Sequence, residues 1–196
     1  MASKCEINSA DQRPQNYVYK TGMSFELNKS LTILKRTPEV LETLLKDLPE
    51  NWTMHNEGGK SWSPFDVVGH LIHGDKTDWI ERTKIILFEG PDKTFTPFDR
   101  FAQFEESKGK NMNQLLQEFR KLRVANIKTL EELKITDDQL DKTALHPSLG
   151  KVTLRNLLAT WTAHDLNHIY QIVRVMAKQY KSEVGPWVQY LRLVNE

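Results

Sequence analysis

Apolar residues recur at steps of three and four along several long stretches of this chain, and this repeat is the feature that most constrains its fold. Such spacing places side chains on one face of an α-helix. A helix with one apolar face must bury that face against other elements. The sequence therefore predicts several long helices packed together, and the first stretch carries the repeat on Phe25, Leu27, Leu31, Leu34, Val40, Leu44 and Leu45.

Proline and capping residues predict where the first two helices bend and begin. Thr37-Pro38 interrupts the first apolar repeat. Because proline is tolerated only at the start of a helix, we expect Thr37 to cap a new segment there. Ser63-Pro64-Phe65-Asp66 offers a capping hydroxyl, a proline at the first helical position and an early acidic residue. We expect this second helix to run to about Phe88 and to stop at Gly90-Pro91.

Two further helices complete the predicted architecture. The third begins near Asn111, and the fourth is capped by Thr153 and runs through Tyr180. The irregular stretch from Pro91 to Lys110 is long for a loop, which is typical of a functional or crossover connection. No strand pair is expected. The predicted fold class is all-α, a four-helix bundle with one long crossover, and the inner face of the third helix is assigned to Leu115, Leu116, Phe119, Leu122, Ile127, Leu130 and Leu133.

Length and composition indicate one domain of ordinary globular type. A chain of 196 residues favours a single domain, with a polar arm over residues 1–22 and the bundle over residues 23–196. The formal charge of +1 and the lack of a basic run argue against a nucleic-acid partner. No stretch approaches the ~18 continuous apolar residues of a membrane span. Since there is one cysteine, Cys5, an intramolecular disulfide and an all-cysteine zinc site are excluded. The N-terminal segment has no apolar core that could serve as a signal peptide, so we expect a cytoplasmic protein.

His164 and His168 lie on the predicted fourth helix at the H-x-x-x-H spacing. At about 100° per residue they stack about 40° apart, one turn above the other. Apolar residues share this arc, and so does Asp165. Polar side chains in an apolar stripe are costly to bury unless something satisfies them, and a divalent cation would satisfy two of them directly. The alternative is that His164 and His168 are hydrogen-bonded core residues without a metal. The apolar stripe consists of Leu157, Trp161, Ile172 and Val175.

A third ligand would come from another helix. His70 and His73 on the second helix are the candidates, and they lie about 60° apart. The apolar stripe of that helix is centred away from His70. Periodicity therefore does not choose between the two histidines.

Several segments together resemble the DinB/YfiT-like superfamily, and they span most of the chain from about Leu27 to its end. The second helix is similar in Ser61-Trp62-Ser63-Pro64, in Val67-Val68-Gly69-His70-Leu71, and in Asp75 and Arg82. The last long helix is similar in residues 146–154 and 160–172. The ending is similar in Val184-Gly185-Pro186-Trp187 and Tyr190-Leu191.

The resemblance implies an up-down-down-up four-helix bundle with a three-histidine metal site. Mapped onto this sequence, the ligands are His70 from the second helix and His164 and His168 from the fourth. Position 75 departs from the family pattern, because it is Asp where Glu is more usual. His73 has no matching role in the family and is interpreted as a structural residue or as part of a pocket wall.

Three neutral imidazoles suit Zn²⁺ or Ni²⁺ and leave one coordination position free, which is typical of a catalytic site. Asp165 and Asp75 are assigned as supporting residues that accept a hydrogen bond from a ligand imidazole or a metal-bound water. The alternative is a surface carboxylate, paired with Arg82 in the case of Asp75. Glu57, Trp62 and His146 are placed in loops near the site, with apolar anchoring for Trp62 and a turn role for His146.

The resemblance also implies three possible functions. The first is an S-transferase in which the metal activates a low-molecular-weight thiol to attack a small-molecule electrophile. The second is a hydrolase that uses metal-bound hydroxide on a hydrolysable substrate. The third is a metal-binding stress-response protein without turnover. The resemblance and exposed tryptophans such as Trp187 also favour a homodimer.

Overall fold

The computed structural model describes residues 22–196, so the predicted arm over residues 1–22 lies almost wholly outside the described part. The elements are α1 (Leu27–Leu34), α2 (Thr37–Leu45), α3 (Glu50–Thr53), α4 (Pro64–Thr77), α5 (Trp79–Phe88), α6 (Ala102–Glu106), α7 (Met112–Glu132), η1 (Asp137–Asp141), β1 (Thr143–His146), β2 (Gly150–Thr153), α8 (Leu154–Lys178), η2 (Gly185–Tyr190) and α9 (Arg192–Asn195).

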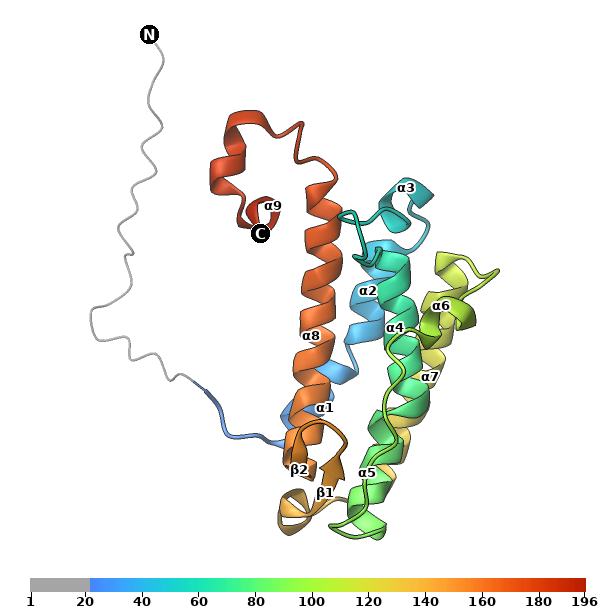
Figure 1. Cartoon of the computed structure of the whole chain (residues 1–196), viewed down its shortest axis with the longest axis vertical. Helices are drawn as coiled ribbons and strands as arrows, with labels where there is room; N and C mark the ends of the chain where they lie inside the picture. Colours follow the sequence, from blue (N-terminus) through green and yellow to red (C-terminus); the bar gives the residue numbers. More distant parts are fainter. Residues whose placement is uncertain (1–21) are drawn as a thin grey trace, which may run out of the picture.

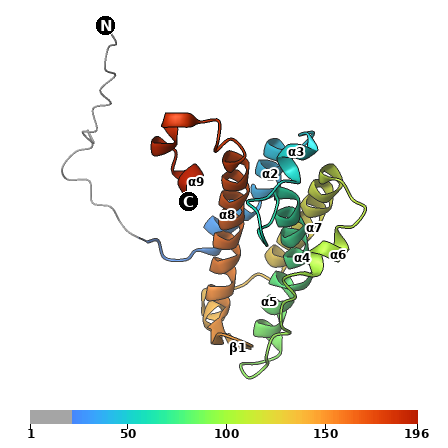
Figure 2. The ribbon, with the colours of Figure 1, turned by 45° about the horizontal axis from the view of Figure 1, so that its top comes forward.

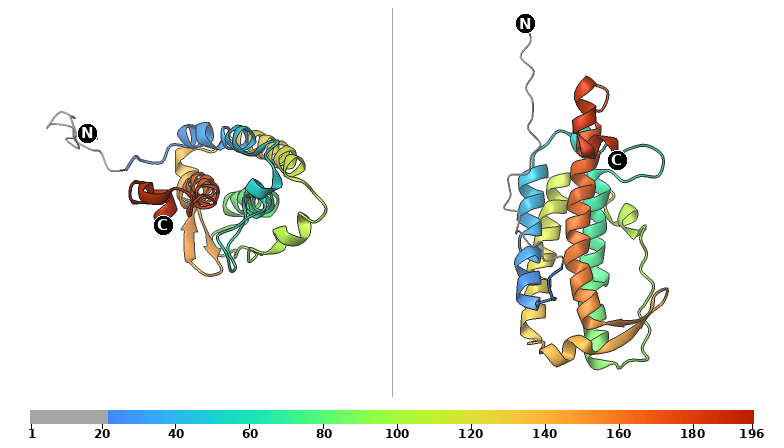
Figure 3. Two further views of the ribbon diagram at one scale, coloured as in Figure 1. Left: turned by 90° about the horizontal axis from the view of Figure 1, so that it is seen from above. Right: turned by 90° about the vertical axis from the view of Figure 1, so that its left-hand side faces the viewer.

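Four long helical columns form the bundle, which confirms the predicted all-α fold class (Figure 1). The columns α1–α2 and α8 run in one direction, and α4–α5 and α7 run in the other, so the order is up-down-down-up. Seen from above in Figure 3, α8 and α4 lie side by side, with α1–α2 and α7 along one side of the pair. The crossover between α5 and α7 passes along the other side, as the tilted view in Figure 2 also shows.

The predicted helix starts are confirmed by their caps. Ser63 Oγ accepts a hydrogen bond from the Asp66 amide, and the Asp66 carboxylate accepts one from the Ser63 amide, which completes a capping box. Asn111 and Thr153 cap α7 and α8 in the same way. Each cap satisfies backbone donors that the first helical turn leaves free.

Thr37 interrupts the first helix as expected, but its predicted capping role is wrong. Arg36 occupies the cap position of α2, without a side-chain hydrogen bond. The Thr37 hydroxyl instead donates to Asp165 Oδ2 at 2.6 Å in the bundle interior. A buried carboxylate that needs a donor therefore determines where this hydroxyl points.

The second predicted helix is divided at Asp78 into α4 and α5. The division is local, because the Asp78 amide still donates to the Gly74 carbonyl, and the Arg82 amide to the Asp78 carbonyl. The two segments therefore form one continuous column from the Ser63 cap to Phe88.

A two-stranded hairpin corrects the expectation that no strands form. β1 and β2 pair antiparallel, with Thr143 opposite Thr153 and His146 opposite Gly150. The crossover joins this hairpin, since the Phe95 amide donates to the Leu145 carbonyl and the Leu145 amide to the Lys93 carbonyl. Strands of four residues are too short to show a convincing alternation. Their position matters for function because they hold the crossover beside α5 and α8.

A buried ionic cluster centred on Arg123 of α7 interrupts the apolar core. Its guanidinium donates to Asp75 of α4 at 2.8 and 3.0 Å, and to Asp165 of α8. It also donates to the Leu34 carbonyl at 3.2 Å. All three charged side chains are at most 1% exposed. One side chain therefore ties α7 to α1, α4 and α8.

Within residues 22–196, no helix combines the length and the apolar character that a membrane crossing needs.

We expect the replacement Arg123→Met to lower the free energy of unfolding by about 3–5 kcal/mol, because it leaves two buried carboxylates without their cation. Urea unfolding followed by circular dichroism measures this change. The matched control is Arg120→Met on the same helix, since Arg120 pairs with Glu42 at a half-exposed position; we expect it to cost less than about 1 kcal/mol. Equal losses of unfolding free energy in the two variants would show that burial of the Arg123 cluster has no energetic consequence.

Candidate metal centre

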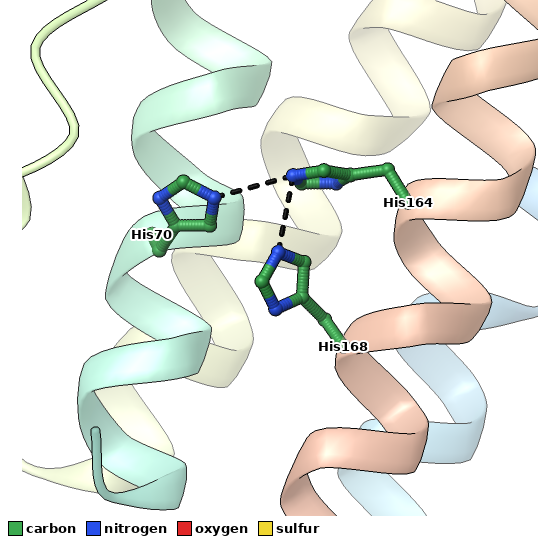
Figure 4. Close-up of side chains that lie close together, drawn as sticks. All are labelled: His70, His164 and His168. Carbon is green, nitrogen blue, oxygen red and sulfur yellow. Dashed lines mark hydrogen bonds between the residues drawn. The ribbon is translucent and has the colours of Figure 1, made fainter. Parts of the chain in front are cut away.

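Three histidines from two helices converge inside the bundle (Figure 4). His70 projects from α4, and His164 and His168 project from successive turns of α8. The Nε2 atom of His164 lies 3.2 Å from Nε2 of His70 and 3.1 Å from Nε2 of His168. Among residues 22–196, these three form the group of metal-ligating side chains whose ligand atoms all lie within 4.8 Å of one another. The structure thus brings together the three predicted ligands.

The spacing of the three nitrogens suits a single cation. Two nitrogens bound to zinc at 2.0–2.1 Å in a tetrahedron lie about 3.3–3.4 Å apart. The observed separations of 3.1 and 3.2 Å are close to this value. The geometry therefore fits three imidazoles around one ion.

The protonation of His168 leaves a lone pair directed at the centre. His168 Nδ1 lies 2.9 Å from Gln171 Oε1, and because an amide oxygen only accepts, Nδ1 carries the proton and Nε2 keeps its lone pair. The His164 nitrogen between the other two has at most one proton to share. A cation would satisfy all three nitrogens at once, as is required of polar atoms buried this deeply.

Burial keeps the histidines neutral. Burial, with repulsion from His168, His73 and Arg100, lowers the pKa of His70 to about 3. Burial, with repulsion from His168, His70 and Arg123, lowers the pKa of His164 to about 2. The pKa of His168 is lowered by burial, against the opposing effects of Gln171 and Asp165. Neutral imidazole is the form that binds metals.

Aromatic rings hold two of the three imidazoles in place. The His70 ring packs against Trp62 at 4.9 Å and Phe98 at 5.5 Å between centroids. The His164 ring packs against Trp79 at 5.1 Å. Nδ1 of each of these two histidines is buried with no hydrogen-bond partner among the described residues. Ring packing, and not a hydrogen bond at Nδ1, therefore orients the outer side of these two imidazoles.

Asp165 and Asp75 do not contact the imidazoles by any hydrogen bond within the described residues. Both are fully enclosed and accept from Arg123, so neither is the surface carboxylate that the alternative interpretation required. Burial raises the pKa of Asp75 to about 6, against the pull of Arg123. Arg82, the suggested partner of Asp75, pairs instead with Asp78 at 2.5 Å. Both aspartates hold α4 and α8 against α7 beside the histidines.

The remaining predicted residues lie around the three histidines in other roles. His73 is outside the cluster, with Nδ1 2.8 Å from Glu106 Oε1. His146 shapes the hairpin turn, because its Nδ1 accepts from the amides of Ser148 and Leu149. Glu57 pairs with Arg174 at 2.8 Å.

An open pocket of about 710 Å³ leads to the three histidines. The crossover contributes Phe95, Phe98 and Arg100 to its wall, and the hairpin contributes His146 and Val152. Its volume is in the range of small-molecule sites.

Residues 33–172 match the model of the DinB superfamily. The chain belongs to the DinB superfamily. Among solved structures, this DinB protein is similar to YfiT from Bacillus subtilis, with a TM-score of 0.69 and 23% sequence identity over 82% of this chain and 93% of the other. YfiT is described as a probable metal-dependent hydrolase with an unusual four-helix bundle topology. No sequence match was found among curated proteins.

Sequence reasoning missed several residues of this DinB site. Arg123 was a detectable signal, because a charged residue stands on the apolar face of its helix between Phe119 and Ile127. Asp78 and Arg100 gave no such signal, since both reach the pocket through tertiary placement of a helix break and a loop.

In the metal-free protein we expect the rings of His70 and His164 to remain neutral at pH 5, because their pKa values of about 3 and about 2 lie below that pH. Nitrogen-15 ring chemical shifts measure this, with His70→Asn and His164→Asn used to assign the signals. Titration of either ring with a midpoint near the ordinary value of about 6.5 would contradict the described burial.

Proposed function

We propose that this protein is an enzyme that holds one divalent metal ion on His70, His164 and His168 and acts on a small molecule in the adjoining pocket. The observation that carries the proposal is the convergence of three neutral Nε2 atoms, 3.1 and 3.2 Å apart, at the floor of an open pocket. The description of YfiT as a probable metal-dependent hydrolase supports metal dependence.

Zn²⁺ or Ni²⁺ suits three imidazole ligands. Three protein ligands leave a position for an outside molecule, and a bound divalent ion there lowers the pKa of a coordinated group and so supplies a nucleophile at neutral pH. The protein contributes the remaining requirements. His168 is fixed by Gln171, the rings of Trp62 and Trp79 fix the other two histidines, and the pocket gives a small molecule access to them.

For the reaction, we propose transfer of a low-molecular-weight thiol to an electrophile. The family resemblance supports this choice, and the pocket volume of about 710 Å³ is large enough for a thiol and a small electrophile side by side. In this scheme Asp165 and Asp75 are positioning residues, because Arg123 lies between them and joins the two helices that carry the histidines.

Hydrolysis is the second candidate, and the description of YfiT favours it. It would use the same histidines and the same pocket, with water in place of the thiol. A metal-binding protein without turnover is the remaining outcome if neither reaction is found.

Replacement of His70, His164 or His168 by Ala is expected to reduce bound metal at least tenfold, because each removes one of three ligands. Elemental analysis after remetallation and desalting measures the metal. The matched control is His73→Ala. His73 is a buried histidine on the same helix as His70, but it pairs with Glu106 and lies outside the cluster. Loss of metal from the His73 variant, with retention in the other three, would contradict the ligand assignment.

Two assays separate the candidate reactions. We expect the zinc- or nickel-loaded protein to accelerate conjugation of a bimane or dinitrobenzene electrophile with a small thiol such as glutathione or bacillithiol. The His164→Ala variant is expected to lose this acceleration. Turnover of ester or amide substrates without thiol, together with no effect of thiols, would instead establish the hydrolase.

A further inference from the structure

The charged residues of the pocket are unequally neutralised. Asp78 and Arg82 form an ion pair at 2.5 Å, and Arg174 is bound by Glu57 at 2.8 Å. Arg100 and Lys60 also line the pocket. No carboxylate of residues 22–196 lies within ion-pair distance of either one. The pocket therefore carries two cationic side chains whose charge is not balanced locally.

Arg100 is held over aromatic rings at the histidine end of the pocket. Its guanidinium carbon lies 5.7 Å from the centroid of the Trp62 ring and 5.4 Å from that of Phe101. These distances are within the range of cation–π contacts. The Trp62 ring in turn packs against the His70 ring at 4.9 Å. One aromatic ring thus separates the guanidinium from the proposed metal ligands.

The electrostatic effect of Arg100 on the site agrees with this closeness. Its charge is among the groups that lower the pKa of His70, after burial and the neighbouring histidines. The guanidinium keeps its N–H donors free for a ligand, because no hydrogen bond to another described residue occupies them. A planar guanidinium presents paired donors that match a carboxylate or a phosphate.

The wall between the histidines and Arg100 is apolar. Trp62 forms one part of it, and Phe98, whose ring is 5.5 Å from that of His70, forms another. A molecule that reacts at the histidines and reaches Arg100 would therefore lay an apolar body against these rings. Its far end would meet cationic groups.

We propose that Arg100, assisted by Lys60, binds an oxyanion group, a carboxylate or a phosphate, on the molecule whose reacting end lies at the three histidines. This inference rests on the proposed function, because it assigns the substrate class of the same pocket. It makes Arg100 the specificity-determining residue and the crossover the element that carries it.

The test uses three thiols with six carbons each that differ at the far end: 6-mercaptohexanoate, 6-mercaptohexylphosphonate and neutral 6-mercapto-1-hexanol. A shorter pair, 3-mercaptopropionate and 3-mercapto-1-propanol, tests which chain length spans from the three histidines to Arg100. Isothermal titration calorimetry of the zinc-loaded protein at low, fixed ionic strength gives each Kd. We expect at least one anionic probe to bind about tenfold more tightly than its neutral counterpart, which corresponds to about 1.4 kcal/mol. The ratio of carboxylate to phosphonate affinity identifies the preferred oxyanion.

Variants locate the effect. Arg100→Met is expected to remove most of the preference for the anionic probe, and Arg100→Lys is expected to retain part of it. The control is Arg36→Met, since Arg36 is also exposed but lies outside this pocket; it should leave the preference unchanged. Binding of the neutral probe should be equal in all these proteins, because its contacts do not include the guanidinium.

The inference would be overturned by equal affinities of anionic and neutral probes for the unmodified protein, or by an unchanged preference in Arg100→Met. Absence of binding by every probe would overturn it as well. Failure of the proposed function is distinguished by elemental analysis, which would then show no bound metal. In that case the same titrations on the metal-free protein remain decisive, because Arg100 and Trp62 do not depend on the ion for their contact.

Discussion

The rest of this structure depends on one buried guanidinium. Arg123 lies in the centre of the bundle between the carboxylates of Asp75 and Asp165, and its flat faces pack near the rings of Phe119 and Trp161 at 4.8 and 5.1 Å. A buried charge of this kind is costly unless every partner is in place. Helices α4, α7 and α8 can therefore pack well in only one register, the one that brings both aspartates to the arginine.

That register is also the one that assembles the histidines. Asp165 follows His164 directly on α8, and Asp75 lies just over one turn beyond His70 on α4. A slip of α8 by one helical turn, about 5.4 Å, would separate Asp165 from Arg123 and would separate the Nε2 atoms beyond the reach of one ion. The ionic cluster and the candidate metal centre are thus neighbouring consequences of the same helix alignment. Neither aspartate needs to touch an imidazole in order to position it.

The crossover and the hairpin convert this centre into a pocket. Backbone hydrogen bonds of Leu145 with Lys93 and Phe95 attach the crossover to the hairpin and hold it beside the open face of α4 and α8. Phe98 and Arg100 enter the pocket from this attached segment. In the proposed function the bundle supplies the rigid ligands, and the loop elements supply the groups that select a substrate, a division of roles common in enzymes.

The sequence by itself determined the helical columns, most of their starts and the fold class, because apolar periodicity and capping residues act within a few residues of one another. It also determined His164 and His168 as a pair, because one helical turn separates them. It left the choice between His70 and His73 to family resemblance, and it gave the wrong partner for Asp75. Only the tertiary structure decided those points, together with the hairpin, the pairing of Asp78 with Arg82, and the place of Arg100. These depend on contacts between residues far apart in the chain, which periodicity along one helix does not encode.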